Sequence, residues 1–71
     1  MMNPTAKIAL VTAAAAWENV AKYATATAAA YRAYAENPSE RNNSLSIMAE
    51  NSFESALTTA RDADDAFASA C

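Results

Sequence analysis

The sequence predicts an all-α fold in which two long antiparallel helices form a hairpin. Alanine, the residue with the highest helix propensity, supplies 21 of the 71 residues, and glycine is absent. Apolar residues recur at intervals of three and four, the spacing of one face of a helix. The two prolines, Pro4 and Pro38, both stand in Asn-Pro-hydroxyl triplets, which are typical of helix starts. We therefore expect a single domain, residues 1–71, built from two helices.

The first helix is predicted over about residues 4–36. Asn3 is a favoured N-cap, and Pro4 suits the first helical position because its missing N–H has no partner within the helix. No glycine or proline interrupts the segment from Thr5 to Glu36.

The second helix is predicted over about residues 38–70, after a turn at about 37–38. In this interpretation Asn37 closes the first helix and caps the next, and Glu40 falls at the third helical position, where its carboxylate meets the positive helix end. A second interpretation extends the polar connection to residue 44, with Ser44 as the N-cap. Either connection is short enough to make the helices antiparallel neighbours.

Both halves carry alanine at every seventh position, beside bulkier apolar residues. Such a repeat keeps one row of side chains facing a partner helix along its whole length, although a high alanine content also produces such rows by chance. In the first half the expected contact stripe and the alanine row beside it are Leu10, Ala13, Trp17, Val20, Ala24, Thr27, Tyr31, Tyr34 and Ala14, Ala21, Ala28, Ala35. In the second half the expected row and its flanking residues are Ala49, Ala56, Ala63, Ala70 and Phe53, Leu57, Ala60, Phe67.

A two-helix hairpin has too narrow a seam to cover all the aromatic side chains of this sequence. At the same time, alanine makes up more than half of the apolar residues, so the larger ones form only a small core for an independent domain. Exposed apolar surface usually marks an interface. We therefore expect either self-association, with a homodimer forming a four-helix bundle, or docking on a larger protein.

Charge is divided unevenly between the two halves. Residues 1–36 carry a formal charge of +1 and residues 37–71 carry −4, which together give the net −3. The cluster Asp62, Asp64 and Asp65 has two interpretations. It is stabilised by Arg61 and by Lys7 at the adjacent end of the hairpin, or it is an acidic patch for a basic partner.

The candidate interface combines aromatic residues and arginine, which often anchor interfaces, with the acidic side chains of the second helix. Its predicted residues are Trp17, Tyr31, Arg32, Tyr34, Glu50, Glu54, Asp62, Asp64 and Asp65. For Tyr31, Arg32 and Tyr34, packing in the core or in a dimer seam, a protein interface and stacking on nucleic-acid bases all remain open.

The composition argues against several other classes of protein and functional site. One cysteine and no histidine leave no disulfide framework, zinc finger or histidine-based triad, and the absence of glycine excludes a phosphate-binding loop. We therefore expect no enzyme activity, cofactor, metal or small-molecule substrate. Cys71 has no neighbouring base to activate it. The apolar run after Lys7 is too short for a membrane span and a poor match to a signal peptide, so we expect a cytoplasmic protein without a membrane partner.

These observations lead to two functional hypotheses. The first is a small non-enzymatic interaction protein (an inhibitor, adaptor or regulator) that docks on a larger protein through an aromatic stripe and an acidic helix face. The alternative is a dimeric hairpin that binds RNA or DNA through the first helix, where Lys7, Lys22 and Arg32 lie. Three cations in each copy can contact few phosphates and would bind RNA or DNA weakly. Nucleic-acid binding is therefore the less favoured of the two hypotheses.

Overall fold

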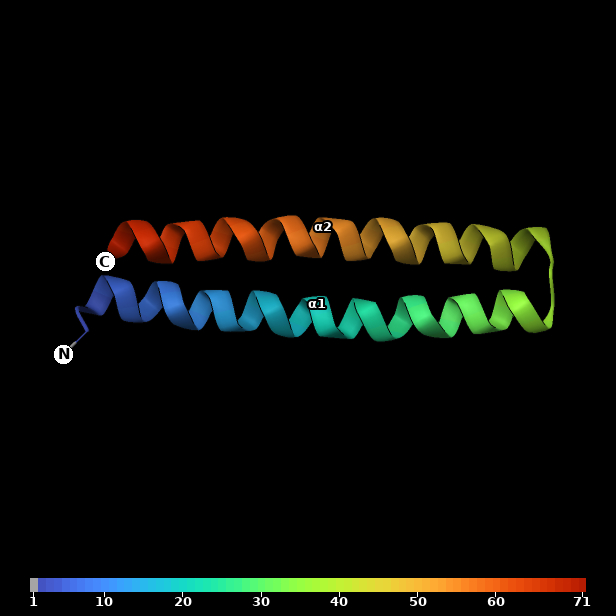
Figure 1. The fold of residues 1–71 in the computed structure, drawn as a ribbon, viewed down its shortest axis with the longest axis horizontal. Helices are drawn as coiled ribbons and strands as arrows, with labels where there is room; N and C mark the ends of the chain where they lie inside the picture. Colours follow the sequence, from blue (N-terminus) through green and yellow to red (C-terminus); the bar gives the residue numbers. More distant parts are fainter. Residues whose placement is uncertain (1) are drawn as a thin grey trace.

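The computed structural model describes residues 2–71 as an antiparallel helical hairpin, which confirms the predicted fold class. Helix α1 spans Pro4–Glu36 and helix α2 spans Glu40–Ala70. The helices lie side by side over their whole length, so that both chain ends are at the same end of the molecule (Figure 1). The Cα trace measures 53 × 14 × 11 Å, the shape of a single layer of two helices with two broad faces.

Helix α1 begins and ends at the asparagines expected from the sequence. The Asn3 side chain accepts a hydrogen bond from the Ala6 backbone N–H at 2.7 Å, and Pro4 occupies the first turn. At the other end the Asn37 backbone N–H donates to the Ala33 carbonyl at 2.9 Å. The first helix therefore has the predicted limits.

Helix α2 begins slightly later than expected. Ser39 is its N-cap, with its hydroxyl oxygen accepting from the Asn42 N–H at 3.1 Å, and Glu40 is the first helical residue. Asn37 closes α1 but does not cap α2, because helical residues begin only at Glu40 and the Asn42 N–H that needs a cap is bonded to the Ser39 hydroxyl. The alternative start at Ser44 is wrong, since residues 40–44 are already helical.

The Asn42 side chain links the two helices at the connection. Its amide Nδ2 donates to the Ala33 carbonyl at 3.3 Å and to the Asn37 carbonyl at 2.8 Å. The Ala33 carbonyl already accepts from the Asn37 N–H, so Asn42 adds a second donor there and a donor to the Asn37 carbonyl, which ties the start of α2 to the end of α1. At the opposite end of the hairpin, the Asn3 Nδ2 donates to the Ala70 carbonyl at 3.3 Å.

The predicted contact row is correct on α2 and only partly correct on α1, where Ala13, Val20, Thr27 and Ala28 are covered as expected. On α2 the four predicted alanines and their flanking residues are buried or half-buried. On α1 the covered row is Ala6, Ala9, Ala13, Ala16, Val20, Tyr23, Thr27 and Ala30. Most of the predicted α1 residues are exposed instead, namely Leu10, Ala14, Trp17, Ala21, Ala24, Tyr31, Tyr34 and Ala35.

The size of the side chains explains which row faces α2. The covered row on α1 consists mainly of alanine, which allows close approach to a helix that contributes Phe53 and Phe67 to the seam. Placing Trp17 and Tyr31 in the same seam would push the helix axes apart. The alanine tract from Ala13 to Ala16 fits either row, so it does not by itself specify which face is covered.

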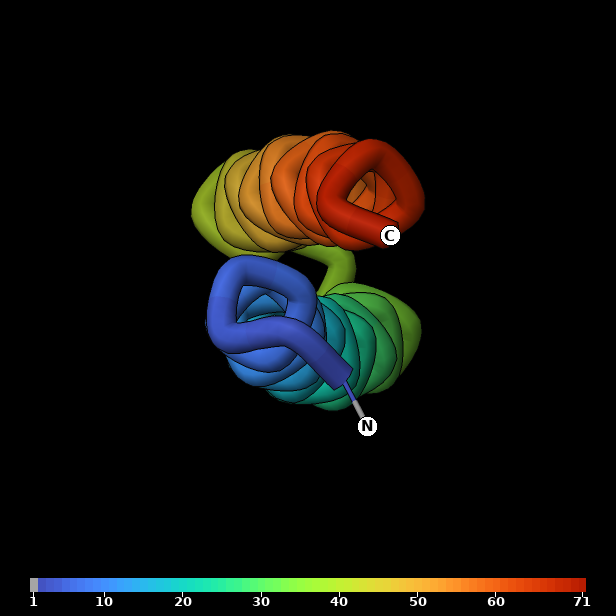
Figure 2. Tube along the Cα trace, turned by 90° about the vertical axis from the view of Figure 1, so that its left-hand side faces the viewer, coloured from blue at the N-terminus to red at the C-terminus, as the bar shows by residue number. Residues whose placement is uncertain are grey.

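The hairpin has a thin core. The buried residues are Ala6, Ala13, Ala16, Ser46 and Ala60. Ten larger apolar side chains remain exposed, and among residues 2–71 no large side chain is fully buried. Viewed along its length, the molecule shows two adjacent helices with no third element over either broad face (Figure 2).

Candidate interaction surface

One broad face of the hairpin carries both the aromatic and the acidic residues of interest. We call it the aromatic–acidic face. On α1 it consists of a stripe, Leu10, Ala14, Trp17, Ala21, Ala24, Ala28, Tyr31 and Ala35, and on α2 it consists of Ile47, Glu50, Glu54, Leu57, Arg61 and Asp64. Two hydrogen bonds between the helices, and one shallow groove, place these residues on the same side of the molecule.

The first of these hydrogen bonds joins Trp17 to Asp64. The indole Nε1–H donates to Asp64 Oδ1 at 3.0 Å. Trp17 remains 40% exposed, so the bond fixes the direction of the ring without covering it. An indole whose only donor is already paired can be covered by a partner without losing a hydrogen bond to water.

The second hydrogen bond joins Tyr31 to Glu50. The phenolic hydroxyl donates to Glu50 Oε1, and this bond to the carboxylate is the main reason that the pKa of Tyr31 is raised above its ordinary value of 10.0. Partial desolvation and the negative charges of Glu50 and Glu54 raise the pKa further. Tyr31 therefore stays a neutral donor, although the residue is 47% exposed.

The two pairs share one register. The interval from Trp17 to Tyr31 on α1 equals the interval from Glu50 to Asp64 on α2, and in each case it is two heptads. At that spacing both aromatic rings project from the same side of α1 and both carboxylates from the facing side of α2. The structure thus brings together four of the predicted interface residues as two matched pairs.

A small apolar groove lies next to Tyr31 on this face. It has a volume of about 240 Å³ and is lined by Ala24, Thr27, Ala28, Tyr31 and Phe53. The alanines leave the space, while Tyr31 and Phe53 form apolar walls. The groove can receive one bulky apolar side chain.

The other predicted interface residues form no hydrogen bond with the Trp17–Asp64 and Tyr31–Glu50 pairs. Arg32, Tyr34, Asp62 and Asp65 are exposed at other positions around the two helices, and Tyr34 is 37% exposed. Glu54 lies on the aromatic–acidic face, one turn from Glu50, and acts on Tyr31 through its charge. Only Asp64 of the acidic cluster at residues 62–65 bonds to α1.

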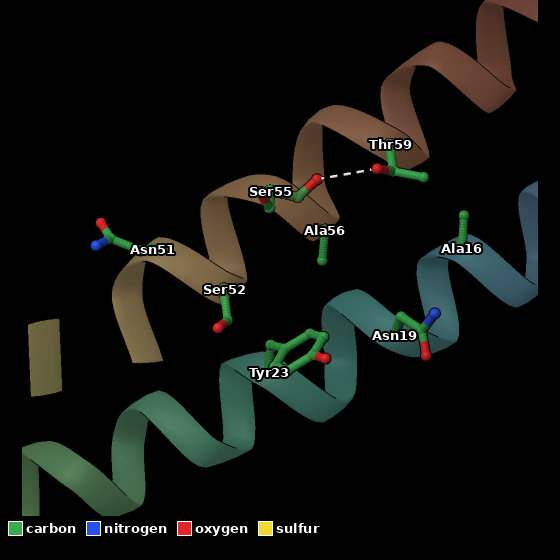
Figure 3. Close-up of a pocket in the computed structure, with 8 residues that line it drawn as sticks. All are labelled: Ala16, Asn19, Tyr23, Asn51, Ser52, Ser55, Ala56 and Thr59. Atoms are coloured by element: carbon green, nitrogen blue, oxygen red, sulfur yellow. Dashed lines mark hydrogen bonds between the residues drawn. The ribbon is translucent and has the colours of Figure 1, made fainter. Parts of the chain in front are cut away.

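The opposite broad face has a polar groove that the sequence reasoning did not anticipate. Its volume is about 430 Å³, and its lining residues are Ala16, Asn19, Tyr23, Asn51, Ser52, Ser55, Ala56 and Thr59. Figure 3 shows Tyr23 between the two helices, and the Thr59 hydroxyl donates to the Ser55 carbonyl at 3.1 Å. The Lys22 ammonium lies 5.9 Å from the centroid of the Tyr23 ring, at the edge of this groove. Amides and hydroxyls beside the contact row are the signal that would have revealed it.

Other features of the described residues offer little further chemistry. Cys71 is an exposed free thiol at the end of α2. Within residues 2–71 no three histidine, cysteine or acidic side chains are grouped so that they could hold a metal ion. In the same part of the chain, neither helix has the length and apolar character needed to cross a membrane.

The chain was compared with protein-family models, curated proteins and solved structures. No protein-family model, curated protein or solved structure matches the chain.

Proposed function

We propose that this chain is a small non-enzymatic interaction protein that acts through its aromatic–acidic face. The observation that carries the proposal is the exposure of large apolar side chains on a hairpin in which, among residues 2–71, four alanines and one serine are buried. Three of the exposed side chains, Leu10, Trp17 and Tyr31, lie in one stripe on α1. A continuous apolar stripe of this kind is typical of an interface.

The polar atoms of the face favour the same interpretation. The donors of Trp17 and Tyr31 are already bonded to Asp64 and Glu50. A partner that covers the two rings therefore avoids the cost of leaving a buried donor unpaired. The free carboxylate oxygens beside the rings favour a partner with basic groups around an apolar centre.

Charge argues for a protein partner in preference to nucleic acid. Lys7, Lys22 and Arg32 of α1 lie next to a helix whose half of the chain carries a charge of −4. A phosphate backbone approaching the aromatic–acidic face would meet Glu50, Glu54 and Asp64, which repel it.

Site-specific photo-crosslinking in the native host tests this function. A photoreactive residue replaces Tyr31 on the aromatic–acidic face, and in a matched variant it replaces the exposed Thr25 outside that face. We expect a discrete protein adduct from position 31 and little adduct from position 25. Equal crosslinking from both positions, or none from position 31, would contradict the proposal.

A further inference from the structure

The stripe on α1 has the spacing of a second helix-packing seam. Its members follow one another at intervals of four and three from Leu10 to Ala35. All but the last of them directly follow a residue of the covered row, so the stripe lies about 100° around the helix from the seam with α2. The two seams are therefore separated by nearly a right angle around the axis of α1. This separation allows α1 to contact α2 through one seam and another helix through the other.

The stripe is complementary to itself when two copies run antiparallel. One of its two rows is entirely alanine, at 14, 21, 28 and 35, while the other contains Leu10, Trp17 and Tyr31. Antiparallel pairing in a heptad seam places each row opposite the other, so that every bulky side chain meets an alanine. Parallel pairing would place Trp17 opposite Trp17 and alanine opposite alanine, which leaves clashes and gaps.

The apolar groove fixes the register of this pairing. Its centre lies near Ala28, which follows Trp17 by roughly three helical turns. Seating the partner's Trp17 against Ala28 places the two-fold axis between Ala21 and Ala24. The stripe carries only alanine there, so the two helices can approach most closely at the axis. The same operation seats Trp17 of the first copy in the partner's groove, as a two-fold interface requires.

Charge is compatible with a seam between two copies of α1. The half of the chain that contains α1 carries +1 and the other half −4, so α1 is the helix that meets its own copy with less repulsion. Arg61 lies one turn before Asp64, at the Trp17 end of the face, while Glu50 pairs with Tyr31 at the groove end. In this register Arg61 comes level with the partner's Glu54, as Asp64 does, so that Arg61 offsets the repulsion between these two acidic side chains.

The broad side of the Cα trace measures 53 Å by 14 Å, about 700 Å² in projection, against about 800 Å² of accessible surface on each partner in standard stable interfaces. A contact of that size requires α2 to take part beside α1.

We infer that the first occupant of the aromatic–acidic face is a second copy of this chain. The two α1 helices pack antiparallel through the stripe, and Trp17 of each copy fills the groove beside Ala28 of the other. This inference rests on the proposed function, because it assumes that the face is an interaction surface. Exposed groups outside the stripe, such as Arg32 and Asp65, remain accessible in the dimer.

Two cysteine variants in a Cys71→Ser background test the register. Ala21→Cys and Ala14→Cys occupy the same alanine row, two turns apart. In the inferred dimer the two copies of position 21 are offset by only about 5 Å along the helix, whereas the two copies of position 14 are separated by roughly 25 Å. We expect a short thiol-to-thiol crosslinker to join the Ala21→Cys chains into a dimer and to leave the Ala14→Cys chains single.

Light scattering on the unmodified chain and on two arginine variants completes the test. We expect a mass of two chains of 7.5 kDa for the unmodified protein and for Ala29→Arg, which lies outside the stripe. Ala28→Arg fills the groove and should give one chain, with circular dichroism showing that the helices persist.

Three outcomes would overturn the inference. Crosslinking at both cysteine positions would indicate parallel pairing, and a dimer without crosslinking at position 21 would place the seam elsewhere. A folded monomer across the concentration series would exclude the second copy as occupant. It would not contradict the proposed function, which fails separately if position 31 yields no adduct in the host.

Discussion

The Trp17 indole donates its only hydrogen bond to Asp64, a residue 47 positions later in the chain, at 3.0 Å. The bond spans the two helices and joins an aromatic residue to a carboxylate of the acidic cluster. Together with the Tyr31–Glu50 bond, two heptads away, it defines how α1 and α2 are aligned along their length. With these bonds made, Trp17 and Tyr31 remain 40% and 47% exposed and available to a partner.

Asp64→Ala should destabilise the hairpin relative to Asp65→Ala. Both changes remove one carboxylate near the C-terminus of α2 and alter helix propensity equally, so their difference isolates the bond to Trp17. We expect a difference of about 0.5–1 kcal/mol in the free energy of unfolding, since the bond is exposed. Denaturant titration followed by circular dichroism measures it, and equal stabilities would show that the bond contributes nothing.

Glu50→Gln should lower the pKa of Tyr31 toward the ordinary value. The Glu50 carboxylate raises this pKa through its hydrogen bond and its charge, and the substitution removes the charge. Because the pKa is higher in the folded than in the unfolded chain, the associated stability is complete below the ordinary value of 10.0 and is lost as pH rises through the folded pKa. Tyrosinate absorbance during an alkaline titration gives the pKa. A Glu36→Gln variant is the control and should leave the Tyr31 pKa unchanged.

Ser39→Ala should destabilise α2, while Ser44→Ala should not. Ser39 accepts a hydrogen bond from the Asn42 N–H at the start of the helix, and Ser44 lies within the helix, where alanine is the better former. The expected loss for Ser39→Ala is about 1 kcal/mol in the free energy of unfolding. Thermal unfolding of the two variants distinguishes a start at Glu40 from a start after Ser44. A larger loss from Ser44→Ala would contradict the structure.

Ala60→Leu should destabilise the hairpin by about 1–3 kcal/mol, because the added carbon atoms have no space between the helices. Ala60 is completely covered at the seam, whereas Ala66 on the same helix is exposed. The matched variant Ala66→Leu should change the free energy of unfolding by less than about 0.5 kcal/mol. Chemical denaturation of both variants provides the comparison, and similar losses would indicate that the seam is loosely packed.

The candidate face was only partly predictable from the sequence. Trp17, Tyr31, Glu50 and Asp64 stand out as residue types that form interfaces, but their pairing depends on the rotation of each helix about its axis. That rotation was misjudged on α1 by one position, because the alanines from 13 to 16 are equally compatible with two adjacent rows. The polar groove on the other face was missed for the same reason, since Tyr23 was not expected to lie between the helices.

The sequence by itself determined that the chain forms two helices joined by a short connection, since alanine, the two prolines and the absence of glycine are local signals that act within a few residues. It also determined the contact row of α2, where phenylalanines flank the alanines. Only the tertiary structure decided that Ser39 caps α2 and that the bulky stripe of α1 faces outward. The outward stripe depends on how closely the two helices can approach, a distance that both side-chain rows set together. The Ser39 cap depends on where α2 begins beside the end of α1, where Asn42 bonds to Ala33 and Asn37.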